Sequence, residues 1–156
     1  MILSYEEKLS DMGVNIPAVP KPVAAYIPAV RAGSCVYTSG QLPLVDGKLM
    51  FSGKIDRDLS MEEGCRAARL CVINCLAAIK SVLGTLDNIE RIVKVTGFVN
   101  SISGFTGQPQ VINGASDFLI EVFGEKGQHA RAAVGVSELP LDSAVEIEMI
   151  ALVKEP

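Results

Sequence analysis

Residues 145–153, Val-Glu-Ile-Glu-Met-Ile-Ala-Leu-Val, decide the class of fold. Every second residue from Val145 to Val153 is apolar, and this period of two predicts a β-strand with one face in the core. Glu146 and Glu148 fall on the opposite face, together with two further apolar residues. A face that mixes carboxylates with apolar side chains is either a solvated strand end or a place where charge meets a partner.

A second strand, predicted over residues 132–136, directly follows Arg131. We expect the two strands to form a hairpin that brings Arg131 within reach of Glu146. The fork of an arginine can hold a carboxylate by two parallel hydrogen bonds, and a nearby glutamate can act as a general base or position a water. From the spacing alone, the pair is either a structural ion pair or a site for a small anion.

Two long helices are predicted upstream. Ser60-Met61-Glu62-Glu63 is a capping box, and the helix that follows runs over residues 61–83 to Gly84. Its polar residues form only a narrow stripe, so we expect it to pack on a sheet and also to touch a neighbour. A second helix is predicted over residues 108–123, after a β-rich stretch at 91–100 and a loop rich in Ser and Gly.

The first 22 residues are predicted to form an N-terminal extension. Ser4-Tyr5-Glu6-Glu7 is another capping box, which predicts a short helix over residues 5–12. The three prolines at positions 17, 20 and 22 should then keep the chain extended.

Between the extension and the long helix, three strands are expected. Residues 23–30 and 35–42 should form a β-hairpin, and residues 48–52 a short strand after the Asp-Gly turn. No repeat, linker or low-complexity segment interrupts the chain. The sequence therefore predicts one α+β domain over residues 1–156.

Charge and hydropathy argue against two classes of function. The net charge is −4 and the 14 Lys and Arg are scattered, so we expect no nucleic-acid partner. No apolar run approaches the roughly 20 residues of a membrane span, and the first residues lack the basic start of a signal peptide, so a cytoplasmic protein is expected. Hydrophobic residues make up 49% of the chain, and this excess suggests that other subunits cover apolar surface.

No metal or cofactor is expected. Cys71 and Cys75 share a helix face, but His129 is the only histidine, whereas a structural zinc takes about four ligands. We therefore expect the four cysteines to pack in the core as small hydrophobes. Neither a GxGxxG nor a P-loop pattern occurs, which disfavours a nucleotide cofactor.

Several weaker candidates lie elsewhere. Thr38-Ser39-Gly40-Gln41 is either a place where a ligand approaches the backbone closely or an ordinary end of a strand. Tyr26 is expected in a strand, near Pro28, which indicates a sheet edge. Phe98 and Phe105 are most simply core residues.

Three blocks of the sequence, at residues 26–43, 94–105 and 130–148, make it recognisable. The last block is the most specific, with Ala130-Arg131-Ala132-Ala133-Val134, then Leu139-Pro140, then the Val-Glu-Ile-Glu strand. With these blocks the chain resembles the Rid family of reactive-intermediate deaminases, also called the YjgF or L-PSP endoribonuclease-like family. The N-terminal extension resembles that of a longer branch of the family.

The resemblance implies a chorismate-mutase-like α+β fold, with a mixed sheet backed by two helices, and a homotrimer with ligand sites in clefts between subunits. It implies that Arg131 holds the carboxylate of a 2-imino acid and that Glu146 places the attacking water, without a cofactor. The other residues that it places in the cleft are Tyr26, Ser39, Gly40, Ser103, Phe105 and the backbone around Ala133.

The chain departs from the family pattern in the pocket. Ala132-Ala133 stands where deaminases have Ser-Cys, and Ser103 stands where an Asn is frequent. The primary hypothesis is hydrolysis of 2-imino or enamine acids to 2-keto acids and ammonia. The alternative is a non-catalytic protein that binds small carboxylates such as keto acids. The RNA-cleaving role that some family labels carry is disfavoured by the acidic charge.

Overall fold

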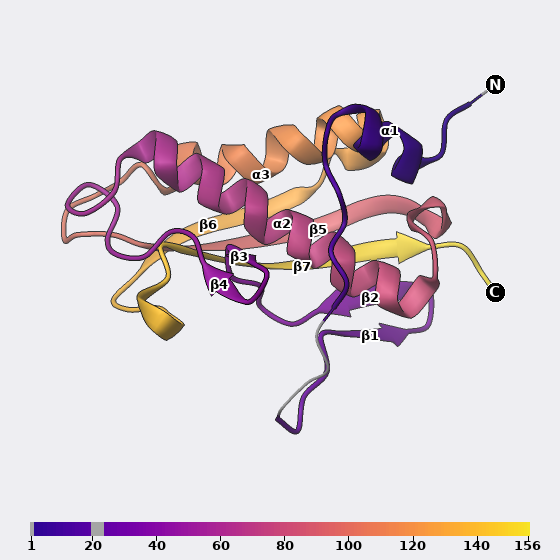
Figure 1. Cartoon of the computed structure of the whole chain (residues 1–156), viewed down its shortest axis with the longest axis horizontal. Coiled ribbons are helices and arrows are strands. Elements are labelled where there is room, and N and C mark those ends of the chain that lie inside the picture. The colour runs from indigo at the N-terminus through magenta and orange to yellow at the C-terminus, as the bar shows by residue number, and fades with distance from the viewer. Residues whose placement is uncertain (1, 20–23) are drawn as a thin grey trace.

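Two helices lie side by side on one face of a five-stranded sheet (Figure 1). The computed structural model describes residues 2–19 and 24–156. The extended conformation predicted for Pro20 and Pro22, and the start of the strand predicted at residue 23, lie outside these ranges.

The helices begin and end where their capping residues predict. Ser4 and Ser60 each close a capping box, with the serine oxygen 3.1 Å from the backbone nitrogen three residues later. Gly84 ends the long helix, where its N–H donates to the carbonyl of Lys80. The α-helices are α1 (Tyr5–Asp11), α2 (Met61–Leu83) and α3 (Gln108–Phe123), with short 3₁₀ turns η1 (Leu86–Asn88), η2 (Gly124–Gly127) and η3 (Pro140–Asp142).

The sheet is mixed, and its strands lie in the order β1-β2-β7-β5-β6. Strand β5 is parallel to β6 and antiparallel to β7. The strands are β1 (Ala29–Ala32), β2 (Cys35–Thr38), β5 (Ile89–Asn100), β6 (Ala130–Val136) and β7 (Val145–Val153), while β3 (Leu44–Val45) and β4 (Lys48–Leu49) form a separate small hairpin.

The prediction that β6 and β7 pair with each other as a hairpin is wrong. Strand β5 lies between them, and β6 pairs with β5 alone. The reason is topological: β5, α3 and β6 form a crossover unit, in which a helix returns the chain so that the next strand can add in parallel. Strand β6 is therefore an edge of the sheet, with one row of backbone groups not paired within the sheet.

The first predicted hairpin is confirmed, but its strands are shorter than expected. Strand β1 begins only at Ala29, so Tyr26 lies in a bend and not in a strand. Pro28 has no N–H to give to a strand ladder, and it also restricts the residue before it. Strand β1 is an edge, as Pro28 indicates, and beyond β2 a single bridge joins Gln41 to Ile147.

The core is aliphatic and lies between the sheet and the helix pair. Val145, Ile147 and Met149 are at most 1% exposed, which confirms the predicted core face of β7. Cys71 and Cys75 are buried as expected, whereas Cys35 and Cys65 are partly exposed. Phe105 packs against the core, but Phe98 is on the other face of the sheet and only partly buried. No helix of the described chain is long and apolar enough to cross a membrane.

Candidate functional site

Arg131 lies on the edge strand β6 and turns its side chain toward α3. Its Nη1 donates to Asn113 Oδ1 at 2.8 Å and to Ser116 Oγ at 3.2 Å. Because both hydrogens of Nη1 have acceptors, these bonds leave Nε and Nη2 on the other side of the guanidinium for a ligand. Asn113 and Ser116 are three residues apart, hence on one helix face, but without the tertiary structure nothing marks that face as the one beside Arg131.

Glu146 lies on β7 and faces the opposite side of the sheet from the core. Gly40 abuts its side chain: a β-carbon on residue 40 would lie 2.9 Å from the Glu146 carboxyl carbon, closer than real β-carbons come to other atoms. The bridge between Gln41 and Ile147, with N···O distances of 2.8 and 3.0 Å, holds the two segments together. Desolvation, and then the charge of Glu148, raise the pKa of Glu146 above its ordinary value.

Ser39 ties the Tyr26 segment to the same place. Its hydroxyl donates to the carbonyl of Ile27 at 2.6 Å, and its N–H donates to the carbonyl of Pro28 at 2.8 Å. Tyr26 precedes these acceptors and is 66% exposed. We call Tyr26, Ser39, Gly40 and Glu146 the Glu146 cluster, which the structure forms from residues that are up to 120 positions apart in the sequence.

Arg131 is not part of the Glu146 cluster in the same chain. Arg131 is level with Val95 of β5, and Glu146 is level with Phe98, so the two backbones are about 10 Å apart along the strands and about 10 Å apart across them. Val95 and Phe98 also point to opposite faces of the sheet. The contact predicted between Arg131 and Glu146 is therefore not made within one chain.

Ser103 and Phe105 lie together on the wall of a separate cavity of about 540 Å³ at the far end of β6. Gln108, at the start of α3, donates through Nε2 to the carbonyl of Phe105 at 2.8 Å. Ala133 lies on β6 between Arg131 and this cavity. The cavity is lined by Lys54, Arg57, Ser101, Ile102, Ser103, Phe105, Gln108, Gly135, Val136 and Ser137.

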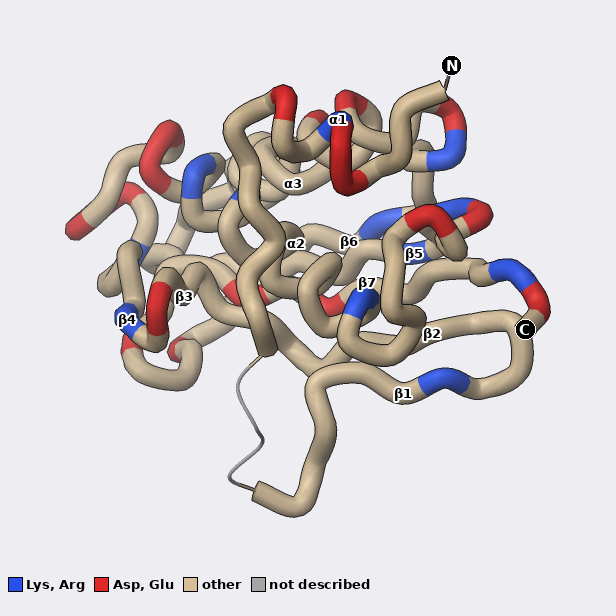
Figure 2. The backbone as a smooth tube through the Cα atoms, turned by 45° about the vertical axis from the view of Figure 1, so that its right-hand side comes forward, with Lys and Arg blue, Asp and Glu red and all other residues tan. Residues whose placement is uncertain are grey.

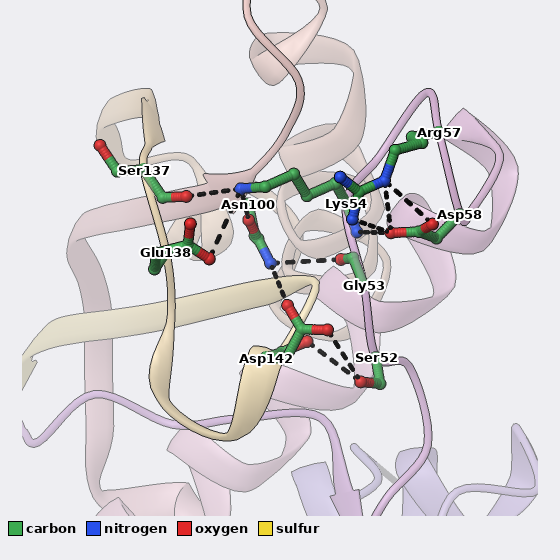
Figure 3. A network of polar contacts seen from close by, with 9 residues as sticks. All are labelled: Ser52, Gly53, Lys54, Arg57, Asp58, Asn100, Ser137, Glu138 and Asp142. Carbon is green, nitrogen blue, oxygen red and sulfur yellow. Dashed lines mark hydrogen bonds and ion pairs between the residues drawn. The ribbon is translucent and has the colours of Figure 1, made fainter.

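Lys54 brings to this cavity a positive charge that no motif in the sequence predicts. Figure 3 shows its ammonium group between three acceptors: Asn100 Oδ1 at 2.7 Å, the carbonyl of Ser137, and Glu138 Oε2 at 3.7 Å. The fully buried Asn100 also donates to Asp142 Oδ1 at 3.1 Å. This network fixes the connection between β6 and β7 against the segment before α2. A lone lysine in a long loop gives no signal in the sequence.

Neither a metal centre nor a basic surface stands out. Within residues 2–19 and 24–156, no three His, Cys, Asp or Glu side chains gather as metal ligands. Burial raises the pKa of Cys71 well above its ordinary value and that of Cys75 to about 12, so both thiols stay protonated. Lys and Arg are spread among the acidic residues along the chain in Figure 2, which does not resemble the concentrated patch that binds nucleic acid.

Comparison with known proteins identifies the class. The family described as YjgF/chorismate mutase-like, putative endoribonuclease, matches residues 6–153, and this chain belongs to that family. Protein TCP17 of Trypanosoma cruzi is 41% identical over 143 residues, which cover 91% of this chain and 89% of that protein. A 2-iminobutanoate/2-iminopropanoate deaminase of Dermatophagoides farinae is 30% identical over 142 residues, covering 90% of this chain and 95% of that protein.

Solved structures confirm a YjgF-type fold. A putative endoribonuclease from Shewanella oneidensis superposes with a TM-score of 0.92 at 33% identity, covering 97% of this chain and all of that one. Escherichia coli TdcF with bound serine gives a TM-score of 0.62 at 26% identity, covering 86% of this chain and 93% of that one. The chain is thus similar to the Shewanella protein over 97% of its length and to TdcF over 86%.

Proposed function

We propose that this protein hydrolyses 2-imino acids to 2-keto acids and ammonia, in a cleft formed between two copies of the chain. The main support for the proposal is the orientation of the Arg131 guanidinium. Asn113 and Ser116 hold the guanidinium by Nη1 alone, which leaves the Nε and Nη2 side for a carboxylate held by two parallel bonds. A relative that shares 30% identity is named as an imine deaminase, and a structural neighbour holds serine, a small molecule with a carboxylate.

The second half of the site is the Glu146 cluster of a neighbouring copy. Within one chain Arg131 and Glu146 lie on opposite faces of the sheet, so a site that uses both needs two chains. Strand β6 is an edge and can meet another chain. The sheet face that the helices do not cover carries exposed apolar side chains, with Val30 at 49%, Tyr37 at 42% and Val134 at 44% exposed. These features support the homotrimer that the family resemblance implies.

The chemistry needs little more than positioning. The carboxylate binds Arg131, and the C2 carbon of the imine is then held near a water that Glu146 places. The water oxygen bonds to C2 while Glu146 accepts a proton, and the raised pKa of this carboxyl makes it a stronger base. As the C=N π bond opens, Glu146 passes this proton to the imine nitrogen, which gives a carbinolamine. The hydroxyl proton of the carbinolamine then moves to the amino nitrogen, the C–N bond breaks, and ammonia leaves while the C2 carbonyl of the 2-keto acid forms. An imine carbon is already electrophilic, so orientation alone accelerates the step.

The chain's own departures from the pattern define the pocket. Ala132 and Ala133 present only methyl groups, and Ala133 is partly buried beside Arg131. The backbone of this edge strand supplies N–H and C=O groups that can hold the attacking water. All four cysteines are free, which is typical of a reducing compartment and supports a cytoplasmic setting.

The decisive experiment generates 2-iminobutanoate in situ with an amino-acid dehydratase and measures ammonia release. Wild-type protein should release ammonia faster than buffer, and Arg131→Ala should lose most of this activity. Arg91→Ala is the matched control, because Arg91 also lies in the sheet but its guanidinium contacts only the carbonyl of Glu125 in the described chain. Arg91→Ala should retain full activity.

The same assay, together with thermal stabilisation by pyruvate, distinguishes imine hydrolysis from the alternative function. A wild-type protein that is stabilised by pyruvate through Arg131, but leaves imine decay at the buffer rate, is a non-catalytic binder of small carboxylates. The replacement of the family's Ser-Cys by Ala132-Ala133 is the observation that favours this second candidate.

Complementation tests whether two chains share the site. Arg131→Ala and Glu146→Gln chains should each lose most of the activity but keep a measurable remainder, and co-expression should restore part of the activity, because some clefts then receive both native residues. Light scattering should give three times the chain mass of 16.6 kDa. A monomer, or a mixture of the two variants that is no more active than either alone, contradicts the shared site.

A further inference from the structure

His129, the only histidine of the chain, is held at both ring nitrogens. Nδ1 lies 2.6 Å from the carbonyl oxygen of Gly127, and Nε2 lies 2.9 Å from Ser116 Oγ. A carbonyl oxygen only accepts, so Nδ1 carries the proton. In the neutral ring Nε2 is then an acceptor, and the Ser116 hydroxyl must donate to it.

The direction of that bond decides what Ser116 can offer Arg131. A hydroxyl has one proton, and the proton of Ser116 points at His129. Its oxygen therefore has its lone pairs free to accept from Arg131 Nη1, 3.2 Å away. Donation runs in one direction through the chain of contacts, from Arg131 to Ser116 to His129 to the carbonyl of Gly127.

We propose that His129 is a positioning residue for the anion site, because through Ser116 it fixes the orientation of the Arg131 guanidinium. This inference rests on the proposed role of Arg131 in holding a carboxylate. Asn113 Oδ1 holds the other hydrogen of Nη1 at 2.8 Å. Two fixed acceptors on one nitrogen define the plane of the guanidinium, so its Nε and Nη2 edge points in one direction before a ligand arrives.

The surroundings of His129 keep the ring neutral, as this arrangement requires. Ser116 is only 9% exposed and His129 is partly buried. Burial lowers the pKa of His129 first, the bond to Gly127 partly opposes this, and the positive charge of Arg131 lowers it further. The elements around the ring also carry Asp117, Glu121, Glu125 and Lys126. Among these residues and Arg131, only the charge of Arg131 contributes to the lowered pKa of His129.

The tautomer of a single histidine can be observed directly. With one imidazole in the chain, a ¹⁵N-edited NMR spectrum needs no assignment, and we expect a neutral ring with its proton on Nδ1 at pH 7.5. Free histidine favours the proton on Nε2, so the expected result differs from the default. A ring protonated on Nε2 overturns the proposal.

Affinity for a carboxylate probe tests the consequence for Arg131. For pyruvate, measured by calorimetry, Ser116→Ala and His129→Leu should each raise Kd about 3- to 10-fold, the size expected for one neutral hydrogen bond. The double variant should be no weaker than either single variant, because both remove the same link. Ser116→Thr, which keeps a hydroxyl, should restore affinity. Losses of affinity that add in the double variant would refute the positioning of Arg131 by His129 through Ser116. The same holds if Ser116→Thr binds pyruvate as weakly as Ser116→Ala.

These outcomes are separate from those that test turnover. If the protein binds pyruvate with this pattern but hydrolyses no imine, the proposed reaction is contradicted and the positioning role of His129 is supported. If the protein hydrolyses imines while Ser116→Ala and His129→Leu leave KM unchanged, the reaction is supported and the positioning role of His129 is contradicted. Wild-type protein with no affinity for pyruvate overturns the inference that His129 serves an anion site.

Discussion

The close approach of Gly40 to Glu146 gives the sharpest test of the site. Gly40→Ala adds one methyl group whose carbon would lie 2.9 Å from the carboxyl carbon and 3.2 Å from Cγ of Glu146. The carboxylate oxygen Oε1 would lie closer still, and ordinary van der Waals contact begins at about 3.4–4 Å, so the carboxyl group must move by more than about 1 Å. A displacement of about 1 Å can lower the rate of a positioned reaction by about 10²-fold. We therefore expect kcat to fall about 30- to 100-fold.

The fold should hardly be affected by this change. Gly40 does not lie in the left-handed region of φ, so alanine fits its backbone, and the clash is with the flexible end of a side chain. A compatible Gly→Ala change stabilises by about 0.4–1 kcal/mol through the unfolded chain. The melting temperature should then stay within about 4 °C of the wild type.

The assay is ammonia release from an imine generated in situ, together with thermal unfolding of the same samples. Glu146→Gln provides the matched background: if Gly40→Ala acts by displacing the carboxylate, it should add no further loss there. Full activity of Gly40→Ala would refute the role of Glu146, and so would an equal loss in the Glu146→Gln background. A large fall in melting temperature would show instead that the methyl group disturbs the fold.

Three further predictions concern packing and reactivity. Gly114→Ala should destabilise by about 1–3 kcal/mol in chemical denaturation, because its β-carbon would lie 2.7–2.8 Å from two backbone carbons of Cys65 on the facing helix and closer still to the Cys65 carbonyl oxygen. Gly64→Ala should cost less, because its β-carbon would meet methyl groups of Ile55 and Val111 at 3.0–3.3 Å, which need to shift by only a few tenths of an ångström. Equal effects would contradict the backbone contact. Asn100→Ala should cost about 2–3 kcal/mol by the same measurement, because the fully buried Asn100 side chain makes three hydrogen bonds, to Lys54, Gly53 and Asp142, and all three are lost. A neutral result would show that the network is dispensable. Native protein at pH 7.5 should leave Cys71 and Cys75 unalkylated by iodoacetamide in a mass spectrum, since burial raises both pKa values; labelling of all four thiols before unfolding would contradict the buried, protonated state.

Local signals in the sequence predicted most elements correctly. The two capping boxes and the glycine that ends α2 fix helix boundaries, because they depend on groups within a few residues of one another. The alternation along residues 145–153 gave the core face of β7 for the same reason. The family could also be recognised, because its C-terminal block is contiguous in the sequence.

Candidate site residues could be named from the sequence, but their grouping could not. The Glu146 cluster depends on the bridge between Gln41 and Ile147, a contact over more than 100 residues. Asn113 and Ser116 resemble any polar residues on a helix until α3 is placed beside β6. Lys54 likewise acquires a role only when Asn100 and the β6–β7 connection surround it.

The sequence by itself determined the bounds of α2 and α3, which face of β7 is apolar, and that Arg131 and Glu146 belong to a family block. Only the tertiary structure decided how far apart those two residues are. Strand order depends on which backbone edges meet after α3 crosses the sheet, and periodicity along one strand contains no information about its neighbour. Strand β5 separates β6 from β7, and the register places Arg131 level with Val95 but Glu146 level with Phe98, so the two side chains face opposite sides of the sheet.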